Sequence, residues 1–285
     1  MGRGMHFETL KNKTVLVAGG ARGIGKGLAQ ACVRAGAKVV ITHLNPDTGQ
    51  QTADELSRFG AVRAVQCDST DRAAVDRLMD DVWSHEGPLD VVFCNAGRGG
   101  SERVLEASMA QVHDLFAANY DSALNVAQAC IPRMLARGEP GHVMFTGSEH
   151  SVGLPAGNEG LGFAIYGATK HAMLIMAEWL RADLDGTPVS VSLLMPGPVL
   201  TEGLAAAFAT LDQDPDNATL RAQFSPEVEH LLRERVISPE RCAEIALQGL
   251  KRGLFYIPTQ DYIQGDIQRR YSEMVDAFDQ LRAAR

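Results

Sequence analysis

Short runs of apolar residues alternate along this chain with longer segments that have the spacing of amphipathic helices. Seven runs predict β-strands, and most of them are rich in Val, Ile and Leu. They lie at Thr14–Ala18, Lys38–His43, Ala61–Cys67, Leu89–Cys94, His142–Thr146, Val189–Leu194 and Leu254–Ile257. Strands of this kind, separated by helices, are typical of βαβ units and of a parallel sheet that is covered on both faces.

The segments between these runs predict the covering helices. One follows the first strand as far as Ala35, and others lie at 47–58, 71–85, 109–135 and 165–184, with a polar tail helix at about 261–284. A further helix starts at Ser238, Pro239 and Glu240, a good capping sequence, and stops at Gly253. No repeat or linker divides the chain. We therefore predict one domain over residues 1–285, a doubly wound, Rossmann-type α/β fold around a mostly parallel seven-stranded sheet.

Two segments interrupt the alternation. Glu149–Ala164 is rich in Gly and Pro, and Glu202–Val236 combines an apolar patch with an acidic stretch. Each follows the carboxyl end of a predicted strand, which is the edge where open α/β sheets bind ligands. We expect the second segment, at about 202–236, to be a mobile lid over a substrate site.

Composition excludes several classes of protein. The net charge of −8 disfavours nucleic-acid binding, which requires a concentrated basic surface. No apolar run approaches the roughly 20 residues of a membrane helix, and Met1–Leu10 lacks the apolar stretch of a secretory signal. The five cysteines are scattered, odd in number and never in CxxC spacing, so we expect reduced thiols and a cytoplasmic protein. The eight histidines show no HExxH spacing, so no metal site is predicted.

A glycine-rich loop, Gly19–Gly25, follows the first predicted strand and leads into a helix. Its glycines permit a tight turn, and the amide groups at the start of the helix attract a pyrophosphate. The spacing is GxxxGxG rather than GxGxxG. In this position the loop predicts a dinucleotide site.

A second pattern, Tyr166 followed by Lys170, places a phenol and an ammonium four residues apart on one face of a helix. A nearby cation stabilises the phenolate and lowers the pKa of the phenol from about 10 toward the range of an acid/base catalyst. The pair alone is only suggestive, but it gains weight from the glycine loop.

Together these motifs resemble the short-chain dehydrogenase/reductase family, over a stretch from about Lys13 to about Ile257. The motifs occur in the family's order: AGGARGIG, CDST, NAG at Asn95–Gly97, Asn119, TGS ending at Ser148, YGATK, and PGPVLT at 196–201. The resemblance implies Tyr166 as general acid/base and Ser148 as the hydroxyl that holds the substrate oxygen. It implies that Lys170 binds the nicotinamide ribose and that Asn119 holds a water in a proton relay.

The resemblance also implies a set of cofactor-binding residues, in which Asp68 binds the adenine ring and Thr201 orients the carboxamide. The set is Gly19, Ala21, Arg22, Gly23, Ile24, Gly25, His43, Asp68, Ser69, Asn95, Ala96, Gly97, Tyr166, Lys170, Pro196, Gly197, Val199 and Thr201. Two features depart from the family. Ala18 replaces the usual Thr before the first glycine, and the interval from Ser148 to Tyr166 is longer by several residues. The longer interval contains Ser151, an alternative catalytic serine.

The end of the second strand favours NADP(H) over NAD(H). An acid there would accept from the ribose 2′-hydroxyl of NAD, but the chain reads Thr42-His43-Leu44-Asn45. Arg22 in the glycine loop is placed to bind a 2′-phosphate. NAD(H) stays open as the alternative, with Asp47 as the residue that would reach the ribose.

The expected reaction is hydride transfer between NADP(H) and a small hydrophobic secondary alcohol or ketone. Apolar residues near the two irregular segments, Leu154, Phe163, Leu204 and Phe208, favour such a substrate, although they also fit a protein core. The Gly253–Pro258 segment and the tail faintly resemble relatives that oxidise aryl-ether benzylic alcohols. Two alternatives stay open: a nucleotide-binding sensor without turnover, and a dehalogenase-like lyase. The resemblance further implies a homo-dimer or homo-tetramer.

Overall fold

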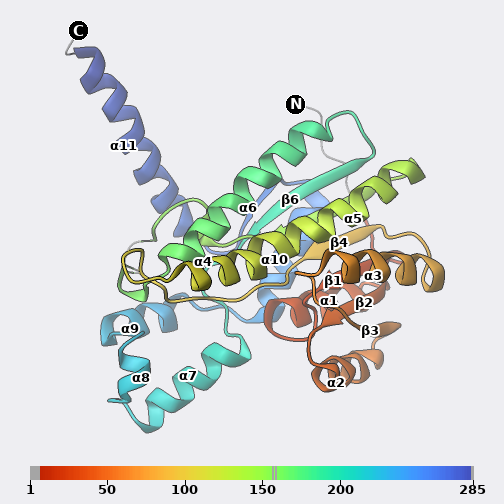
Figure 1. The fold of residues 1–285 in the computed structure, drawn as a ribbon, viewed down its shortest axis with the longest axis horizontal. Helices are drawn as coiled ribbons and strands as arrows, with labels where there is room; N and C mark the ends of the chain where they lie inside the picture. The colour runs from red at the N-terminus through yellow and green to blue at the C-terminus, as the bar shows by residue number, and fades with distance from the viewer. Residues whose placement is uncertain (1–6, 156, 158, 284–285) are drawn as a thin grey trace.

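Seven parallel strands form one sheet at the centre of the molecule, in the order β3-β2-β1-β4-β5-β6-β7 (Figure 1). The computed structural model describes residues 7–155, 157 and 159–283. The strands are β1 (Thr14–Ala18), β2 (Lys38–His43), β3 (Val62–Gln66), β4 (Val91–Cys94), β5 (Gly141–Thr146), β6 (Val189–Met195) and β7 (Tyr256–Pro258). The chain moves outward from β1 to β3 and returns to β4 beside β1, which creates the crevice where such sheets bind ligands. The predicted fold class is confirmed.

Helices cover both faces of this sheet. One face packs on α3 (Arg72–His85), α5 (Ser122–Arg137) and α6 (Ala164–Asp183). The other packs on α1 (Gly23–Arg34), α2 (Pro46–Ser57) and α10 (Pro239–Arg252). Because both faces are covered, the strands are apolar on both sides, which is the pattern that the sequence displays.

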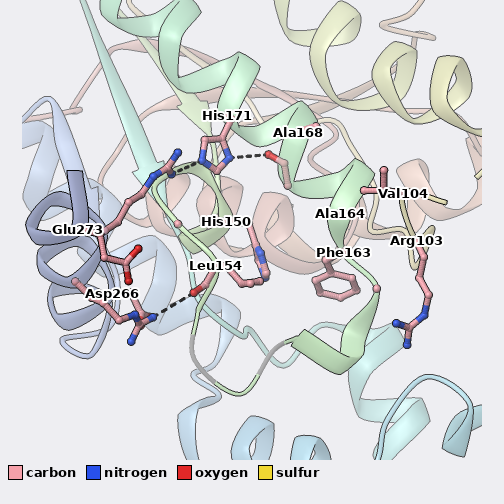
Figure 2. Close-up of a pocket in the computed structure, with 15 residues that line it drawn as sticks. Arg103, Val104, His150, Leu154, Phe163, Ala164, Ala168, His171, Asp266 and Glu273 are labelled. Carbon is pink, nitrogen blue, oxygen red and sulfur yellow. Dashed lines mark hydrogen bonds and ion pairs between the residues drawn. The ribbon is translucent and has the colours of Figure 1, made fainter. Parts of the chain in front are cut away.

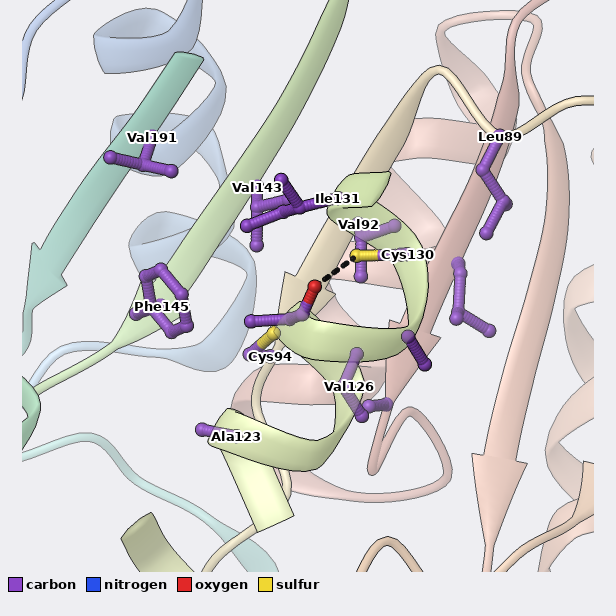
Figure 3. Packing of buried hydrophobic residues seen from close by; sticks show 14 of the residues in the cluster. Leu89, Val92, Cys94, Ala123, Val126, Cys130, Ile131, Val143, Phe145 and Val191 are labelled. Atoms are coloured by element: carbon purple, nitrogen blue, oxygen red, sulfur yellow. Dashed lines mark hydrogen bonds between the residues drawn. The ribbon is translucent and has the colours of Figure 1, made fainter. Parts of the chain in front are cut away.

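The core beside α5 illustrates this packing (Figure 3). Val126 and Cys130 of α5 lie over Val92 of β4, with Phe145 of β5 in the same cluster, and all four are buried. All five cysteines of the chain are free and buried. Burial raises the pKa of the Cys130 thiol to about 12, so this cysteine packs as a small apolar residue.

The long helix expected at 109–135 is interrupted. It consists of α4 (Met109–Phe116), a π-helical turn at Ala117–Asp121, and α5. A π-turn inserts one extra residue into the helix and is common at functional sites. Asn119 lies inside this turn, so the local distortion and the proposed functional residue coincide.

The segment expected to be a lid is helical rather than irregular. It contains α7 (Glu202–Gln213), α8 (Ala218–Arg221) and α9 (Pro226–Arg235). Phe208, Phe224, Val228 and Leu232 form a small cluster of their own with Leu161. The segment is divided into three separate helices, so no single periodicity runs through it. Its mobility stays a prediction.

The tail forms α11 (Ile263–Ala283), close to the predicted range, whose last residue, 284, lies outside the described residues. Within the described residues, no helix has the length and apolar character to cross a membrane.

One close contact fixes α2 against the sheet. A Cβ added at Gly49 would lie 1.9 Å from Cδ2 of the buried His43 ring. We therefore expect Gly49→Ala to lower the free energy of unfolding by about 1–3 kcal/mol, as overpacking does, despite the better helix propensity of alanine. Chemical denaturation measures this. Gly203→Ala in α7 is the matched control, since no atom lies within 4 Å of its added Cβ. Equal stability of the two variants would contradict the prediction.

Candidate active site

Ser148, Tyr166 and Lys170 are brought together beyond the carboxyl end of β5. Ser148 lies two residues past Thr146, the last residue of β5, and caps a short 3₁₀ turn at Glu149–Ser151. Tyr166 and Lys170 lie in the first two turns of α6. The Ser148 hydroxyl forms a hydrogen bond with the Tyr166 phenol. Residues that are 22 positions apart in the sequence, Ser148 and Lys170, thus belong to one site.

The Tyr166 ring belongs to an aromatic trio. It meets Phe163 edge to face at 5.4 Å and His150 at 5.9 Å between ring centroids, and His150 meets Phe163 at 5.4 Å. Such edge-to-face contacts restrict ring orientation. Burial lowers the pKa of His150 to about 4, so this ring is neutral near neutral pH. Neither His150 nor Glu149 was assigned to the site from sequence, although their position directly after Ser148 was a signal.

The expected lowering of the Tyr166 pKa is wrong for this structure. Burial raises the pKa of the phenol, the Glu149 carboxylate raises it further, and only the Ser148 hydrogen bond lowers it. Among the hydrogen bonds of the described residues, none joins the Lys170 ammonium to the Tyr166 hydroxyl. The ammonium lies 5.6 Å from the ring centroid, and its Nζ donates to the Thr146 carbonyl oxygen at 2.8 Å.

Lys170 is itself buried in α6. Burial lowers its pKa to about 8 because the charged form loses solvation. A lysine with that pKa can hold or release a proton near neutral pH.

Asn119 is fully buried in the π-turn and lies next to the first two turns of α6. Its Nδ2 donates to Thr169 Oγ1 at 3.1 Å, and its Oδ1 accepts from the Arg98 amide at 2.8 Å. Thr169 is the neighbour of Lys170 in α6. The bond to Thr169 thus connects Asn119 to α6, the helix that holds Tyr166 and Lys170. Among the hydrogen bonds of the described residues, none joins Asn119 to Lys170 itself.

Ser151 is placed differently from Ser148. Ser151 is fully buried, and its Oγ accepts from the Ser148 amide at 3.1 Å. The Ser148 Oγ accepts from the His150 amide at 3.2 Å and also reaches Tyr166. Ser151 therefore supports the turn from behind, and Ser148 is the serine next to the phenol.

The glycine loop is anchored by residues outside it. Ala18 has no hydroxyl that could hold the loop, but Thr42 of β2 provides one, since its Oγ1 accepts from the Gly19 amide at 2.9 Å. Thr52 of α2 donates to the Ala21 carbonyl at 2.9 Å, and Asn95 donates to the Gly19 carbonyl at 3.1 Å. A Cβ at Gly25 would lie 2.0 Å from that same carbonyl oxygen, so this position accepts only glycine.

An acid occupies the start of α1. The Gly23 amide donates to both carboxylate oxygens of Glu202, at 2.9 and 3.3 Å, and the Arg22 side chain provides no cap. Helix N-termini stabilise anions, so the Glu202 carboxylate stands where a phosphate would be favoured. The amide at the start of α1 and the close-packed glycines of the loop therefore fit the phosphates of a dinucleotide. Glu202 was missed from sequence because it lies 179 residues from Gly23.

The residues expected near the adenosine ribose differ in exposure, since Arg22 lies at the surface and His43 is buried. Arg22 is exposed and its Nη2 donates to Thr48 Oγ1 at 3.0 Å, at the start of α2. Asn45 accepts from the Thr48 amide and caps α2. His43 is buried with its ring against Gly49, and burial lowers its pKa. Arg22 therefore lies beside the end of β2, with its side chain at the surface.

Asp68 and Ser69 follow β3. Asp68 is exposed and accepts from the Thr70 amide at 2.9 Å, whereas the cap of α3 is Asp71. Asn95 follows β4, and its Oδ1 accepts from the Thr146 hydroxyl at 3.1 Å. Ala96 and Gly97 continue this floor: Gly19 approaches Ala96, and Gly97 approaches Asn119.

The Pro196–Thr201 segment, which follows β6, forms another side of the site. Thr201 Cγ2 would lie 2.9 Å from a Cβ at Gly23, so this segment meets the glycine loop. Gln260 accepts from the Gly197 amide at 2.8 Å, and Tyr262 donates to Glu149. The start of the tail thus reaches the site, which the prediction of a surface helix did not include.

A cavity of about 940 Å³ lies beside this site but not in it (Figure 2). Its lining includes Ala164, Ala168 and His171 of α6, Arg103, and residues of α11. Phe163 and His150 line it from the side of the aromatic trio, whereas Ser148, Tyr166 and Lys170 do not line it. In the described part of the chain, no group of three or more His, Cys, Asp or Glu side chains could hold a metal ion.

Comparisons with known proteins agree with this geometry. A family model for the short chain dehydrogenase matches residues 13–212. The 1-deoxy-11-beta-hydroxypentalenate dehydrogenase of Streptomyces avermitilis is 40% identical over 224 residues, which cover 76% of this chain and 78% of that protein. The chain belongs to the short-chain dehydrogenase/reductase family. It is an oxidoreductase that acts on alcohol or carbonyl groups.

Two solved structures show the similarity of the fold. A short-chain dehydrogenase/reductase from Burkholderia phymatum in complex with NAD has a TM-score of 0.79 at 26% identity, covering 94% of this chain and 95% of that chain. A Beutenbergia cavernae protein with bound NADP has a TM-score of 0.71 at 25% identity, covering 89% and 97%. Similar folds therefore occur with both dinucleotides.

The loop anchor can be tested directly. Thr42→Val removes the acceptor of the Gly19 amide and keeps the shape, so the free energy of unfolding should fall by about 1 kcal/mol. Thr210→Val is the matched control, because that exposed hydroxyl only donates to the Ala206 carbonyl within α7. Chemical denaturation compares the two. An unchanged Thr42→Val protein would mean that the loop does not depend on this hydroxyl.

Proposed function

We propose that this protein transfers a hydride between NADP(H) and a hydrophobic secondary alcohol or ketone, with Tyr166 as general acid/base. The observation that supports this most is the hydrogen bond between the Tyr166 phenol and Ser148, at the edge of the sheet that also presents the glycine loop, with Lys170 in the next turn of the same helix. A sensor without turnover would need no such acid/base group.

In the direction of reduction, Ser148, Tyr166 and Lys170 have separate roles. The Ser148 hydroxyl holds the carbonyl oxygen, and the Tyr166 phenol donates its proton to that oxygen. A nicotinamide held at this edge of the sheet would provide the hydride for the carbonyl carbon. Lys170 returns a proton toward the phenolate, since its pKa of about 8 permits exchange near neutral pH. Asn119 positions this end of α6 through Thr169. Oxidation runs these steps in reverse.

The proposed cofactor contacts follow the edge of the sheet. The amides of the glycine loop hold the pyrophosphate, with Asn95, Ala96 and Gly97 as the floor. Lys170 would bind the nicotinamide ribose, and Thr201, which lies beside the glycine loop, would orient the carboxamide. Asp68 and Ser69 bind the adenine end. Arg22, exposed beside the end of β2, binds the 2′-phosphate of NADP(H), where the described residues at 42–45 offer no carboxylate.

The proposed substrate is hydrophobic. The aromatic pair of Phe163 and His150 borders Tyr166. Phe163 and Leu204 of α7 both pack against the cluster of Leu161, Phe208, Phe224, Val228 and Leu232, which we call the lid cluster. The relative at 40% identity is named for a hydroxypentalenate, which is a carboxylate that also bears a hydroxyl, and a hydroxyl is the group on which the proposed reaction acts. Phe208 is buried within the lid cluster and therefore supports the lid rather than the substrate.

We also propose a homo-oligomer in a reducing compartment, the cytoplasm. The five free, buried thiols are consistent with that compartment.

The acid/base assignment predicts the behaviour of Tyr166→Phe. This change removes the proton donor but keeps the ring and its edge contacts, so turnover should fall by more than tenfold while NADPH affinity stays within about twofold. Initial rates and fluorescence titration measure the two effects. Tyr120→Phe, half-buried in the π-turn, is the matched control. Residual activity above a tenth of wild type would remove Tyr166 from this role.

Cofactor preference depends on Arg22. A charge-assisted hydrogen bond contributes about 1.5–3 kcal/mol, so Arg22→Ala should weaken NADPH binding by roughly 10–150-fold and leave NADH nearly unchanged. The ratio of kcat/KM for the two cofactors with one ketone is the measurement. Arg58→Ala, another cation on the α2 side, is the control. A wild-type protein that prefers NADH tenfold would reverse the assignment.

Glu202 should compete with the cofactor. Its carboxylate occupies the Gly23 amide, so Glu202→Gln replaces a charged acceptor by a neutral one and should tighten NADPH binding about fivefold. Asp216→Asn, an exposed acid in the same segment, controls for the loss of one charge. Equal dissociation constants for wild type and Glu202→Gln, by calorimetry, would show that the contact does not oppose binding.

A further inference from the structure

Glu149, the residue after Ser148, is a buried acid next to the proposed acid/base group. It is the first residue of the 3₁₀ turn at Glu149–Ser151, and only 5% of it is exposed. A carboxylate loses most of its solvation at such a position, so its burial is unfavourable unless other groups compensate. The backbone of Glu149 is fixed, since its amide donates to the Pro196 carbonyl oxygen at 2.8 Å. The proposed reaction has so far assigned no role to this side chain.

A phenol from the start of the tail holds the Glu149 carboxylate. Tyr262, which lies between β7 and α11, donates its hydroxyl proton to Oε2 of Glu149. Burial raises the pKa of Tyr262, and the charge of Glu149 raises it further. This phenol therefore stays protonated and remains a donor to the carboxylate.

The two chain neighbours of Glu149 place it beside the Tyr166 phenol. Ser148, on one side, forms the hydrogen bond with Tyr166. His150, on the other side, has its Nε2 4.0 Å from Oε1 of Glu149, and its ring centroid lies 5.9 Å from that of Tyr166. Because the residues before and after Glu149 both contact the tyrosine, the carboxylate is close enough for its charge to act on the phenol.

Other titratable and charged groups surround this pair. They are Lys170 and His171 of α6, Arg235 of α9, His150 of the 3₁₀ turn, Tyr262, and Asp266 and Arg270 of α11. Lys170 donates to the Thr146 carbonyl oxygen, and Arg235 and Asp266 act on Tyr262 in opposite directions. The charge that acts on the Tyr166 phenol is the one on Glu149.

A negative charge beside Tyr166 affects the two directions of the reaction differently. In reduction the phenol gives its proton to the carbonyl oxygen, whereas in oxidation the phenolate accepts the proton of the alcohol. Burial already raises the pKa of Tyr166, and the Glu149 charge raises it further because two like charges repel. The phenol therefore stays protonated to a higher pH than it would beside a neutral residue.

We propose that Glu149 is a positioning residue that acts through Tyr166: its carboxylate, held by Tyr262, keeps the phenol protonated and so adapts the site to carbonyl reduction at neutral and moderately alkaline pH. This rests on the proposed function, because it requires Tyr166 to be the acid/base group. It also gives the start of the tail a part in the control of the reaction.

The test compares wild type with Glu149→Gln, which keeps the size of the side chain and an oxygen that accepts from Tyr262. The rate of alcohol oxidation should increase with pH as the phenolate forms, and this increase should occur about one pH unit lower in Glu149→Gln. The rate of reduction should decline at correspondingly lower pH. Glu178→Gln is the matched control and should keep the wild-type profile, because Glu178 also accepts from a tyrosine, Tyr256, but lies in the second half of α6.

Glu149→Asp separates the effect of the charge from that of the contact. It keeps the charge but shortens the side chain, which weakens the contact with Tyr262. If the charge controls Tyr166, the pH profile of Glu149→Asp stays closer to wild type than that of Glu149→Gln. A purely structural Glu149 predicts the reverse order. That order, or a Glu149→Gln protein that does not fold, would overturn the proposal.

Titration of the protein without cofactor gives a second measurement that needs no turnover. Ultraviolet difference spectra follow the formation of tyrosinate, and subtraction of the Tyr166→Phe titration isolates the signal of Tyr166. This signal should appear about one pH unit lower in Glu149→Gln. Equal titrations of Tyr166 in the two proteins would overturn the role of Glu149 and leave the proposed function intact. A Tyr166→Phe enzyme that keeps its turnover would overturn both.

Discussion

The site depends on Thr146, the last residue of β5. Its carbonyl oxygen accepts from Lys170 of α6, and its hydroxyl donates to Asn95 at the end of β4. The side-chain amide of Asn95 in turn donates to the Gly19 carbonyl, just past the end of β1. One threonine thus links the helix that holds the proposed acid/base group to the loop that presents the amides for an anion. Because parallel strands end at the same edge, this short chain of hydrogen bonds can span the crevice.

The common edge at which the parallel strands end also explains which parts of the fold and of the site could be predicted from the sequence. The seven strands were predicted because both sides of each are apolar, and the glycine loop and the Tyr–Lys pair were recognised by local spacing. Local spacing places Tyr166 and Lys170 on one helix face, whatever the rest of the fold. Strand topology then brings Ser148 and Asn95 to the same edge, so the set of residues followed from pattern and fold class together.

Contacts between distant segments could not be predicted. Thr42 of the neighbouring strand provides the hydroxyl that Ala18 lacks, and Glu202 of α7 reaches Gly23 from 179 residues further along the chain. Neither has a sequence signal, since each depends on how two elements meet in space. The pKa of Tyr166 was misjudged for a related reason. The sequence shows the charge four residues away, but not the burial or the Thr146 carbonyl that engages that charge.

The anchor at Thr42 has a consequence for protein engineering. Thr42 and His43 are neighbours at the end of β2, and their side chains point to opposite sides of the strand. One ties the glycine loop and the other fills the space under α2. Redesign of nucleotide preference at this strand end therefore risks loosening the loop that every dinucleotide would share. Libraries that hold Thr42 constant and vary residues from Leu44 onward would separate selectivity from the integrity of the scaffold.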